Sequence, residues 1–159
     1  MPFPKCFHPS PNFAAEPPNT REGVVIHHTC LSLEETIRKM LNPDSQVSYH
    51  AIIALDGSQH TLVPDTCVAW HAGVSTFLGR DHCNRFTLGL AFEGDTYRAP
   101  LLDDQIESAL EWLAARWAAN RWTINCITDH RQVAPGRKDD LNPPEWERFR
   151  AALARRFGV

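Results

Sequence analysis

Three short segments of the sequence carry side chains that could hold a metal ion and do chemistry at it. These residues are the pair that ends VVIHH, the histidine after TINCIT and three charged residues of GRKDD: His27, His28, His130, Lys138, Asp139 and Asp140. Two imidazoles and one carboxylate would bind zinc and leave a fourth position open, which is the pattern of a catalytic zinc site. The local HExxH spacing is missing. The same residues could therefore be satisfied polar groups at a strand end and a solvated loop.

These side chains can meet only if the strands that end beside them are neighbours. Residues 24–28 form a short β-branched run, which predicts a buried strand. The Asp56-Gly57 pair within 49–63 predicts a hairpin of two strands. Further strands are expected over 86–94 and 123–128.

Helices are expected at three places between and after these strands. Each has a residue typical of a helix start, Ser32, Asp103 or Asn142. The predicted helices cover 32–41, 103–120 and 142–157. Alternating strands and helices indicate one α/β domain, with a mixed central sheet, an antiparallel hairpin and helices packed on it.

Two segments show no regular periodicity. Residues 1–22 are rich in proline, so we expect an N-terminal arm that precedes a domain over 23–159. Residues 64–85 form a long loop that contains AWHAG, and loops of this length are usually functional. Gly89 lies inside an expected strand, where glycine lets another group approach the backbone closely.

The composition narrows the class of protein. A net charge of −3 over 159 residues gives no sign of binding to nucleic acid or to an anionic membrane surface. The sequence has no leader-like start and no run near the ~18 apolar residues of a membrane span. Its five cysteines show no CxxC spacing, which favours reduced thiols over a disulfide framework. We therefore expect a cytoplasmic protein.

Five segments together resemble a known enzyme family. In order they are VVIHHT, VSYHAIIALDGSQHTLVPD, AWHAG, CNRFTLGLAFEG and TDHRQVAPGRKDD. Over residues 9 to about 150 the chain resembles the zinc-dependent N-acetylmuramoyl-L-alanine amidases, which include recycling enzymes, phage amidases and peptidoglycan recognition proteins. Residues 69–96 look most like the cytosolic recycling enzymes that cleave anhydromuramoyl peptides. The resemblance implies hydrolysis of the amide between N-acetylmuramoyl, or anhydromuramoyl, and L-alanine in muropeptides.

The resemblance also assigns roles to the residues named first. The zinc ligands would be His27, His130 and Asp140, and not Asp139. Lys138 would stabilise the oxyanion that develops when activated water attacks the amide carbonyl.

One position departs from the recycling enzymes. They carry a glutamate as proton acceptor where this sequence has Ala91. Phage amidases and recognition proteins place a tyrosine in the hairpin strand instead, and Tyr49 matches that position. We expect Tyr49 to orient or deprotonate the water, with Glu93 as the alternative.

The remaining assignments concern the substrate. By position in the family, His28, Trp70 and His71 would contact sugar or peptide. Arg80 and His82 lie near the position where relatives hold a carboxylate of the stem peptide.

Two other functions stay open from sequence. The chain could be a non-catalytic muropeptide-binding module, or a phage or effector amidase that acts on intact wall. Zinc content separates the first from an enzyme, and activity on whole sacculi separates the second from a recycling role.

Overall fold

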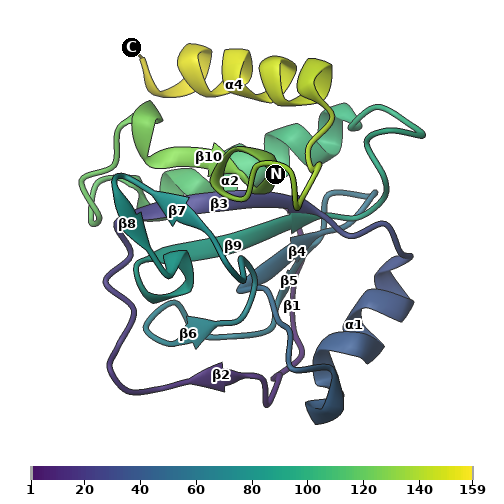
Figure 1. Ribbon diagram of the computed structural model, residues 1–159. Coiled ribbons are helices and arrows are strands. Elements are labelled where there is room, and N and C mark those ends of the chain that lie inside the picture. Colours follow the sequence, from purple (N-terminus) through teal and green to yellow (C-terminus); the bar gives the residue numbers. More distant parts are fainter. Residues whose placement is uncertain (1, 159) are drawn as a thin grey trace.

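A six-stranded mixed sheet lies at the centre of the fold (Figure 1). The computed structural model describes residues 2–158. In spatial order the strands are β1 (Lys5–Phe7), β5 (Gln59–Thr61), β4 (Ala51–Ile53), β9 (Thr87–Phe92), β3 (Gly23–His28) and β10 (Ile127–Asp129). β4 and β5 form the predicted antiparallel hairpin, and the other neighbouring strands run parallel. The prediction of one α/β domain with a mixed sheet is confirmed.

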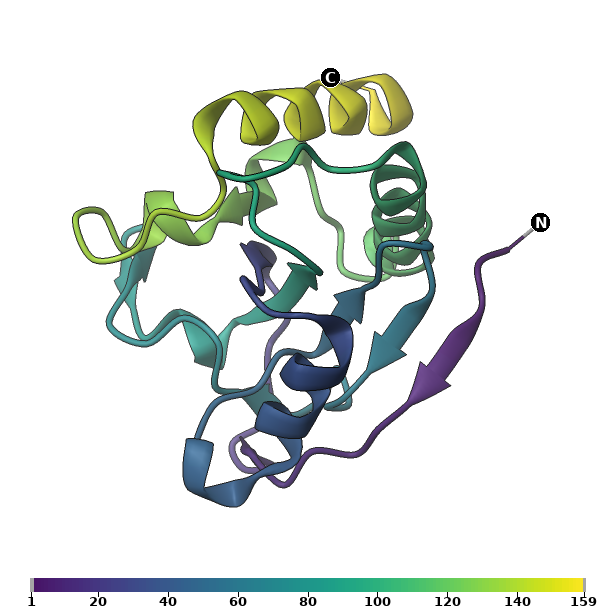
Figure 2. The same cartoon turned by 90° about the vertical axis from the view of Figure 1, so that its right-hand side faces the viewer.

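Helices cover both faces of this sheet. They are α1 (Leu33–Leu41), α2 (Asp103–Trp117), the short α3 (His130–Val133) and α4 (Pro143–Phe157), with 3₁₀ turns η1 (Pro43–Ser45), η2 (Cys83–Arg85) and η3 (Ile124–Cys126). Figures 1 and 2 show α2 and α4 on one side and α1 on the other. Ser32 caps α1 as predicted, because its hydroxyl accepts the Glu35 N–H at 3.2 Å. Among the described residues, no helix combines the length and apolarity that a membrane crossing needs.

The alternation of side chains along β3 decides which residues reach the site. Val24 and Ile26 pack into the core formed with α2 and α4. Successive residues of a strand point to opposite faces, so Val25 and His27 point to the other face. Val25 packs there against Phe86 and Val133 in a smaller cluster. The hydrophobic pattern of β3 therefore fixes the face on which His27 must lie.

Two smaller sheets extend the structure beyond the central one. β2 (Phe13–Ala14) pairs with β6 (Val68–Ala69), and β7 (Thr76–Phe77) pairs with β8 (Arg80–Asp81). The last three of these strands lie in the stretch predicted as a long loop, 64–85. β1 and β2 come from the segment 1–22 that we predicted to be an arm, so this segment supplies an edge strand of the central sheet.

Two predicted elements need correction. The strand expected over 123–128 is β10 at Ile127–Asp129, because the preceding residues close the turn η3 with a Cys126 N–H bond to Thr123 O at 2.9 Å. The helix expected over 103–120 ends at Trp117, since the chain turns there and Trp122 N–H bonds Trp117 O at 3.1 Å. Asp103 is the first residue of that helix, and the N-cap position is Leu102.

Candidate metal centre and active site

Two histidines from neighbouring parallel strands meet at one edge of the sheet. Ile26 of β3 pairs with Asp129 of β10, so the residues that follow, His27 and His130, are also neighbours. Both side chains are buried, and their ring centroids lie 4.5 Å apart. We expected these histidines to meet only if their strands were neighbours, and the parallel pairing of β3 with β10 meets that condition.

The loop after α3 returns a carboxylate to the same place. Asp129 anchors this loop, because one of its oxygens accepts the Gln132 N–H and the other accepts the Leu141 N–H, each at 3.1 Å. The neighbouring Asp140 then lies against β3, where its carboxylate accepts the His28 N–H at 3.3 Å. The buried Asp129 thus positions Asp140 beside the two histidines.

The three side chains have the spacing of a metal site. His27 Nδ1 lies 3.0 Å from His130 Nδ1, and Asp140 oxygens lie 3.6 Å from the first nitrogen and 3.4 Å from the second. A tetrahedral zinc ion with bonds of about 2.0–2.1 Å places its ligand atoms about 3.3 Å apart. His130 Nε2 is 3.0 Å from the Ala72 carbonyl, to which it can only donate, so its Nδ1 offers a lone pair. Two imidazole nitrogens and a carboxylate converge as a cation requires.

Electrostatics favour the metal-binding forms of these residues. Burial, and then repulsion from His130, lower the pKa of His27 to about 4, so its ring is neutral near pH 7. Burial opposes the ionisation of Asp140, but its closeness to His130 and His27 outweighs burial and holds the pKa of this carboxyl well below its usual range. A neutral imidazole and an ionised carboxylate are the forms that bind metal.

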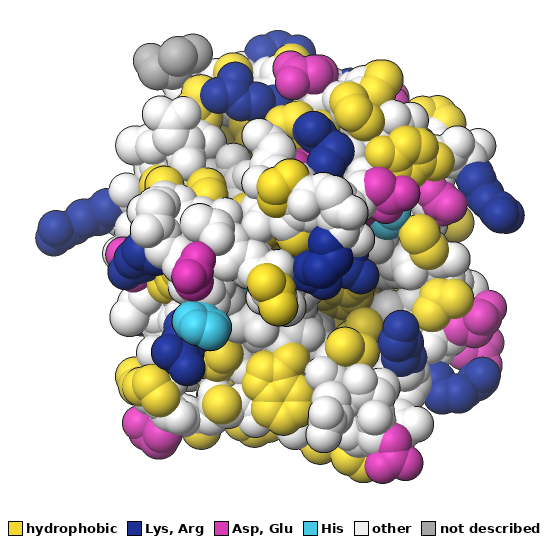
Figure 3. Space-filling view, in the orientation of Figure 1, with side chains coloured by type: hydrophobic (Ala, Val, Ile, Leu, Met, Phe, Trp, Pro, Cys, Tyr) yellow, Lys and Arg dark blue, Asp and Glu magenta, His cyan; other side chains and the backbone are white. Residues whose placement is uncertain are grey.

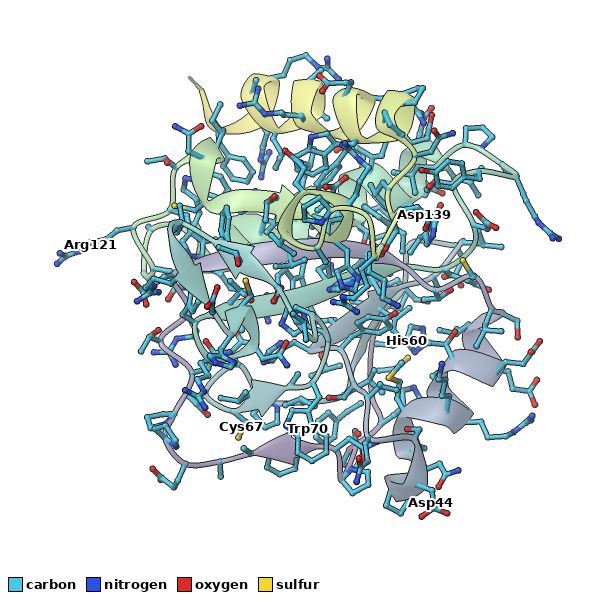
Figure 4. All side chains as sticks on the ribbon, in the orientation of Figure 1. Asp44, His60, Cys67, Trp70, Arg121 and Asp139 are labelled. Atoms are coloured by element: carbon cyan, nitrogen blue, oxygen red, sulfur yellow. The ribbon has the colours of Figure 1, made fainter. Side chains whose placement is uncertain are left out.

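A cavity of about 430 Å³ opens beside these residues. Tyr49, just before β4, and Trp70, just after β6, line this cavity. Lys138 and Asp139 line it from the loop before α4. In Figure 4, Asp139 lies above Trp70 on this face. Figure 3 shows Lys and Arg side chains gathered near the middle of the same face. The cavity could take a ligand that carries both apolar and anionic groups.

Two of the residues expected to take part in catalysis lie at this cavity. The Tyr49 ring is centred 5.0 Å from that of His27. Burial, and then the charge of Asp140, raise the pKa of its phenol, so Tyr49 stays protonated at neutral pH. Lys138 lines the cavity directly beside Asp139 and Asp140.

Three residues expected to contact substrate also line the cavity: His28, Trp70 and His71. His28 is buried, and its Nδ1 accepts the Thr96 N–H at 3.1 Å. His71 is buried beneath His27, with its Nδ1 3.0 Å from His27 Nε2. Burial, and then the charges of His27 and His50, lower the pKa of His71 well below its ordinary value.

Glu93 occupies a different place from the one expected of a catalytic base. One carboxylate oxygen accepts the Leu33 N–H at 3.0 Å, and the other accepts the Leu55 N–H at 2.8 Å. Both oxygens are therefore committed to the start of α1 and to the hairpin turn. Within residues 2–158, Glu93 is not among those that line the cavity.

Arg80 and His82, which were expected to contact substrate, also lie away from the cavity beside His27 and His130. They line a separate hollow with Pro17, Pro18 and Thr20 from the N-terminal segment. Arg80 is held there by Glu22 at 2.8 Å and lies over the Phe86 ring. The β7–β8 hairpin takes both residues away from the cavity, which the sequence could not show.

Two contributors were missed by sequence reasoning. Arg137 donates to Ala72 O at 2.6 Å and to Val74 O at 2.7 Å, which ties the AWHAG segment to the loop of Asp140. Asn84 accepts the N–H groups of His71 and Ala72 at 3.2 and 2.8 Å. Arg137 stands in the charged run GRKDD and Asn84 in the CN pair, so both lay within the motifs already noted.

Comparison with known proteins identifies the family. The family described as N-acetylmuramoyl-L-alanine amidase matches residues 17–144. The chain belongs to this family. It is 30% identical over 166 residues to the 1,6-anhydro-N-acetylmuramyl-L-alanine amidase AmpD of Salmonella typhimurium, which covers 92% of this chain and 88% of that protein. The resemblance seen in the sequence is confirmed, and the chain is an amidase.

Solved structures of this amidase's relatives share its fold. A crystal structure of a selenomethionine AmpD derivative matches with a TM-score of 0.78 and 29% identity, covering 92% of this chain and 93% of that one. The amidase AmiD from E. coli, in complex with anhydro-N-acetylmuramic acid-L-Ala-D-gamma-Glu-L-Lys, matches with a TM-score of 0.73 and 24% identity. That match covers 85% of this chain and 58% of the AmiD chain.

Proposed function

We propose that this amidase is a zinc enzyme that cleaves anhydromuramoyl-L-alanine bonds in soluble muropeptides, as in peptidoglycan recycling. The observation that carries the proposal is the convergence of His27, His130 and Asp140 at a cavity lined by Tyr49 and Lys138. The name of the AmpD relative supplies the substrate class.

His27, His130 and Asp140 would hold the zinc ion. When bound, zinc supplies a Lewis acid that polarises the amide carbonyl and makes nearby water more acidic. Three protein ligands leave one coordination position for substrate or water, which distinguishes a catalytic from a structural site.

Tyr49 would transfer a proton during the reaction, and Lys138 would stabilise a developing charge. Because the Tyr49 phenol stays protonated, it would orient water by hydrogen bonding, pass its proton to the departing amine of L-alanine and regain one from the attacking water. Lys138 would stabilise the negative charge that develops on the carbonyl oxygen. Glu93 has no part in the proposed mechanism, because the backbone uses both of its oxygens.

His28 would donate a hydrogen bond to the muropeptide. Its Nδ1 accepts from Thr96, so in the neutral ring the proton lies on Nε2 and is available to a ligand. Lys39, Arg137 and Lys138 line the cavity and suit an anionic stem peptide, while Trp70 offers an aromatic face to a sugar.

We place the enzyme in the cytoplasm. Its cysteines are unpaired: Cys6, Cys30, Cys67, Cys83 and Cys126. Unpaired thiols fit a reducing compartment, and soluble anhydromuropeptides are the substrates of a recycling enzyme.

The test compares two substrates and one inactive variant. Zinc-loaded protein is incubated with an anhydromuramoyl tetrapeptide and, separately, with intact sacculi, and mass spectrometry detects the released peptide. We expect release from the soluble muropeptide and none by His130→Ala. A protein that neither holds zinc nor releases peptide would instead be a muropeptide-binding module, and faster release from sacculi would indicate a lytic role.

A further inference from the structure

A buried hydrogen-bond chain runs away from His27 on the side opposite the metal position. His27 Nε2 lies 3.0 Å from His71 Nδ1, His71 Nε2 lies 3.4 Å from Thr87 Oγ1, and Thr87 Oγ1 lies 2.7 Å from the Cys83 carbonyl. His27, His71 and Thr87 are all buried. The order of donors and acceptors in this chain decides which nitrogen of His27 carries a proton.

The direction of the chain is set at its far end. A carbonyl oxygen only accepts, so the single hydroxyl proton of Thr87 goes to Cys83 O. Thr87 can then only accept from His71, which places the proton of the neutral His71 ring on Nε2. His71 Nδ1 is left as an acceptor for the Nε2 proton of His27. His27 therefore presents an unprotonated Nδ1 toward His130 and Asp140.

Thr87 disfavours the opposite polarity of the chain. With its proton on Nδ1, His71 would donate to His27 Nε2 and push the His27 proton onto Nδ1, where a metal must bind. That arrangement leaves two lone pairs facing each other between His71 Nε2 and Thr87 Oγ1. Thr87 thus opposes this arrangement, whereas the 3.0 Å contact between His27 Nδ1 and His130 Nδ1 favours it when no cation is bound.

One dipeptide serves both ligand histidines. The His71 side chain accepts from His27, and the carbonyl of the next residue, Ala72, accepts from His130 Nε2 at 3.0 Å. Asn84 holds this dipeptide by accepting both of its backbone N–H groups. The ring of His71 fits because residue 89 is glycine, where an added Cβ would lie 2.5 Å from His71 Cγ.

We propose that His71 and Thr87 are positioning residues, which hold His27 in the tautomer with a free Nδ1 and so raise the affinity of the site for zinc. This rests on the proposed function only in taking His27 as a zinc ligand. Groups that fix the tautomer of a ligand histidine are typically worth about 10–100-fold in metal affinity.

Two measurements that need no substrate test the proposal. The first is the ¹⁵N NMR spectrum of the His27 side chain in zinc-free wild-type protein, where we expect a proton on Nε2 and none on Nδ1. The second is the zinc dissociation constant, measured by competition with a chelator. We expect His71→Phe to weaken zinc binding about 10–100-fold. Thr87→Val should weaken it in the same direction, and Thr87→Ser, which keeps the hydroxyl, should restore the wild-type value.

The outcomes separate this proposal from the proposed function. A His27 proton on Nδ1 in the wild type would overturn it, and that result does not depend on any variant folding. Wild-type zinc affinity in folded His71→Phe and Thr87→Val would overturn it as well. If the tautomer and affinities are as expected but no muropeptide is cleaved, the proposed function fails and this proposal stands.

Discussion

Two neighbouring aspartates on one loop have different surroundings. Asp140 is buried against His27 and His130, whereas Asp139 is exposed and uses its carbonyl to accept from the Tyr97 hydroxyl at 2.7 Å. We expect Asp140→Ala to weaken zinc binding by more than about 100-fold, since even a group that only supports a ligand is worth about 10–100-fold. Asp139→Ala should keep wild-type zinc content by elemental analysis. Loss of zinc from Asp139→Ala alone would make the other aspartate the ligand.

Tyr49 is the group at the cavity that is suited to move a proton. Such a group typically contributes on the order of 10² to 10⁴ in rate. We therefore expect Tyr49→Phe to lower kcat on a muropeptide by that order, while the zinc content is unchanged because the phenol is not a ligand. Wild-type turnover by Tyr49→Phe would remove this role.

Glu93 supplies the matched control, because the structure gives it a different task. Glu93→Ala should keep kcat within a few-fold of the wild type but lower the free energy of unfolding by about 1–3 kcal/mol, since the Leu33 and Leu55 N–H groups lose a charged acceptor. Urea denaturation measures the second effect. An inactive but fully stable Glu93→Gln would show that the proton acceptor lies on the late strand instead.

At the scale of elements, strand β9 packs closely against the segment that follows β6. Gly89 of β9 lies against the ring of His71 in that segment, so a substitution at Gly89 tests this contact. An alanine Cβ would meet the His71 ring at 2.5 Å, so the ring or the strand must move. We expect Gly89→Ala to lower stability by about 1–3 kcal/mol and to weaken zinc binding. The double variant Gly89→Ala/His71→Ala removes the clash, so thermal unfolding should show part of the stability restored. Strictly additive losses would mean that the two residues do not compete for space.

Several elements of the fold could be predicted because their signals are local. The β-branched run before His27, the Asp56-Gly57 turn and the Ser32 cap each act within a few residues. The start of β10 could not be predicted, because TINCIT contains neither glycine nor proline to mark a turn, and only the turn at Thr123–Cys126 decides where pairing with β3 begins.

The part of the site that could be predicted consists of residues in family motifs and at the ends of strands. His27, His130 and Asp140 do come together, as the parallel pairing of β3 and β10 requires. The separate hollow of Arg80 and His82 depends on the β7–β8 hairpin, whose strands are two residues each. The backbone bonds of Glu93 depend on α1 and the hairpin turn meeting at the end of β9. Contacts of this kind join distant segments and leave no pattern in the sequence.

Over the whole molecule, buried histidines should make folding sensitive to mild acid. Burial lowers the pKa of His50 from 6.5 to about 4, and its ring accepts the Gly89 N–H and bonds Cys67 O. The unfolded state binds a proton more readily, so this contribution is complete above about pH 6.5 and is lost as the pH falls toward about 4. We expect the zinc-free protein to lose up to about 3 kcal/mol from this group across that window.

Urea denaturation of the zinc-free protein at pH 7, 6 and 5 measures the loss. The control is His50→Gln, which cannot take up a proton and should show a shallower fall in stability over the same range, from a lower starting value. Equal slopes for the two proteins would show that His50 does not couple folding to pH.

The outermost strand of the central sheet, β1, covers an edge of β5 that would otherwise be open. β1 lies parallel to β5 in the register Lys5↔Gln59, Cys6↔His60 and Phe7↔Thr61, and the rings of His8 and His60 stack beside it. Without β1, the backbone groups of β5 would lie along an open sheet edge, which is a template for pairing with another chain. We therefore expect removal of residues 1–8 to cause self-association. Light scattering would then show an apparent molecular mass that rises with protein concentration. The small β1 strand would thus protect the protein against aggregation.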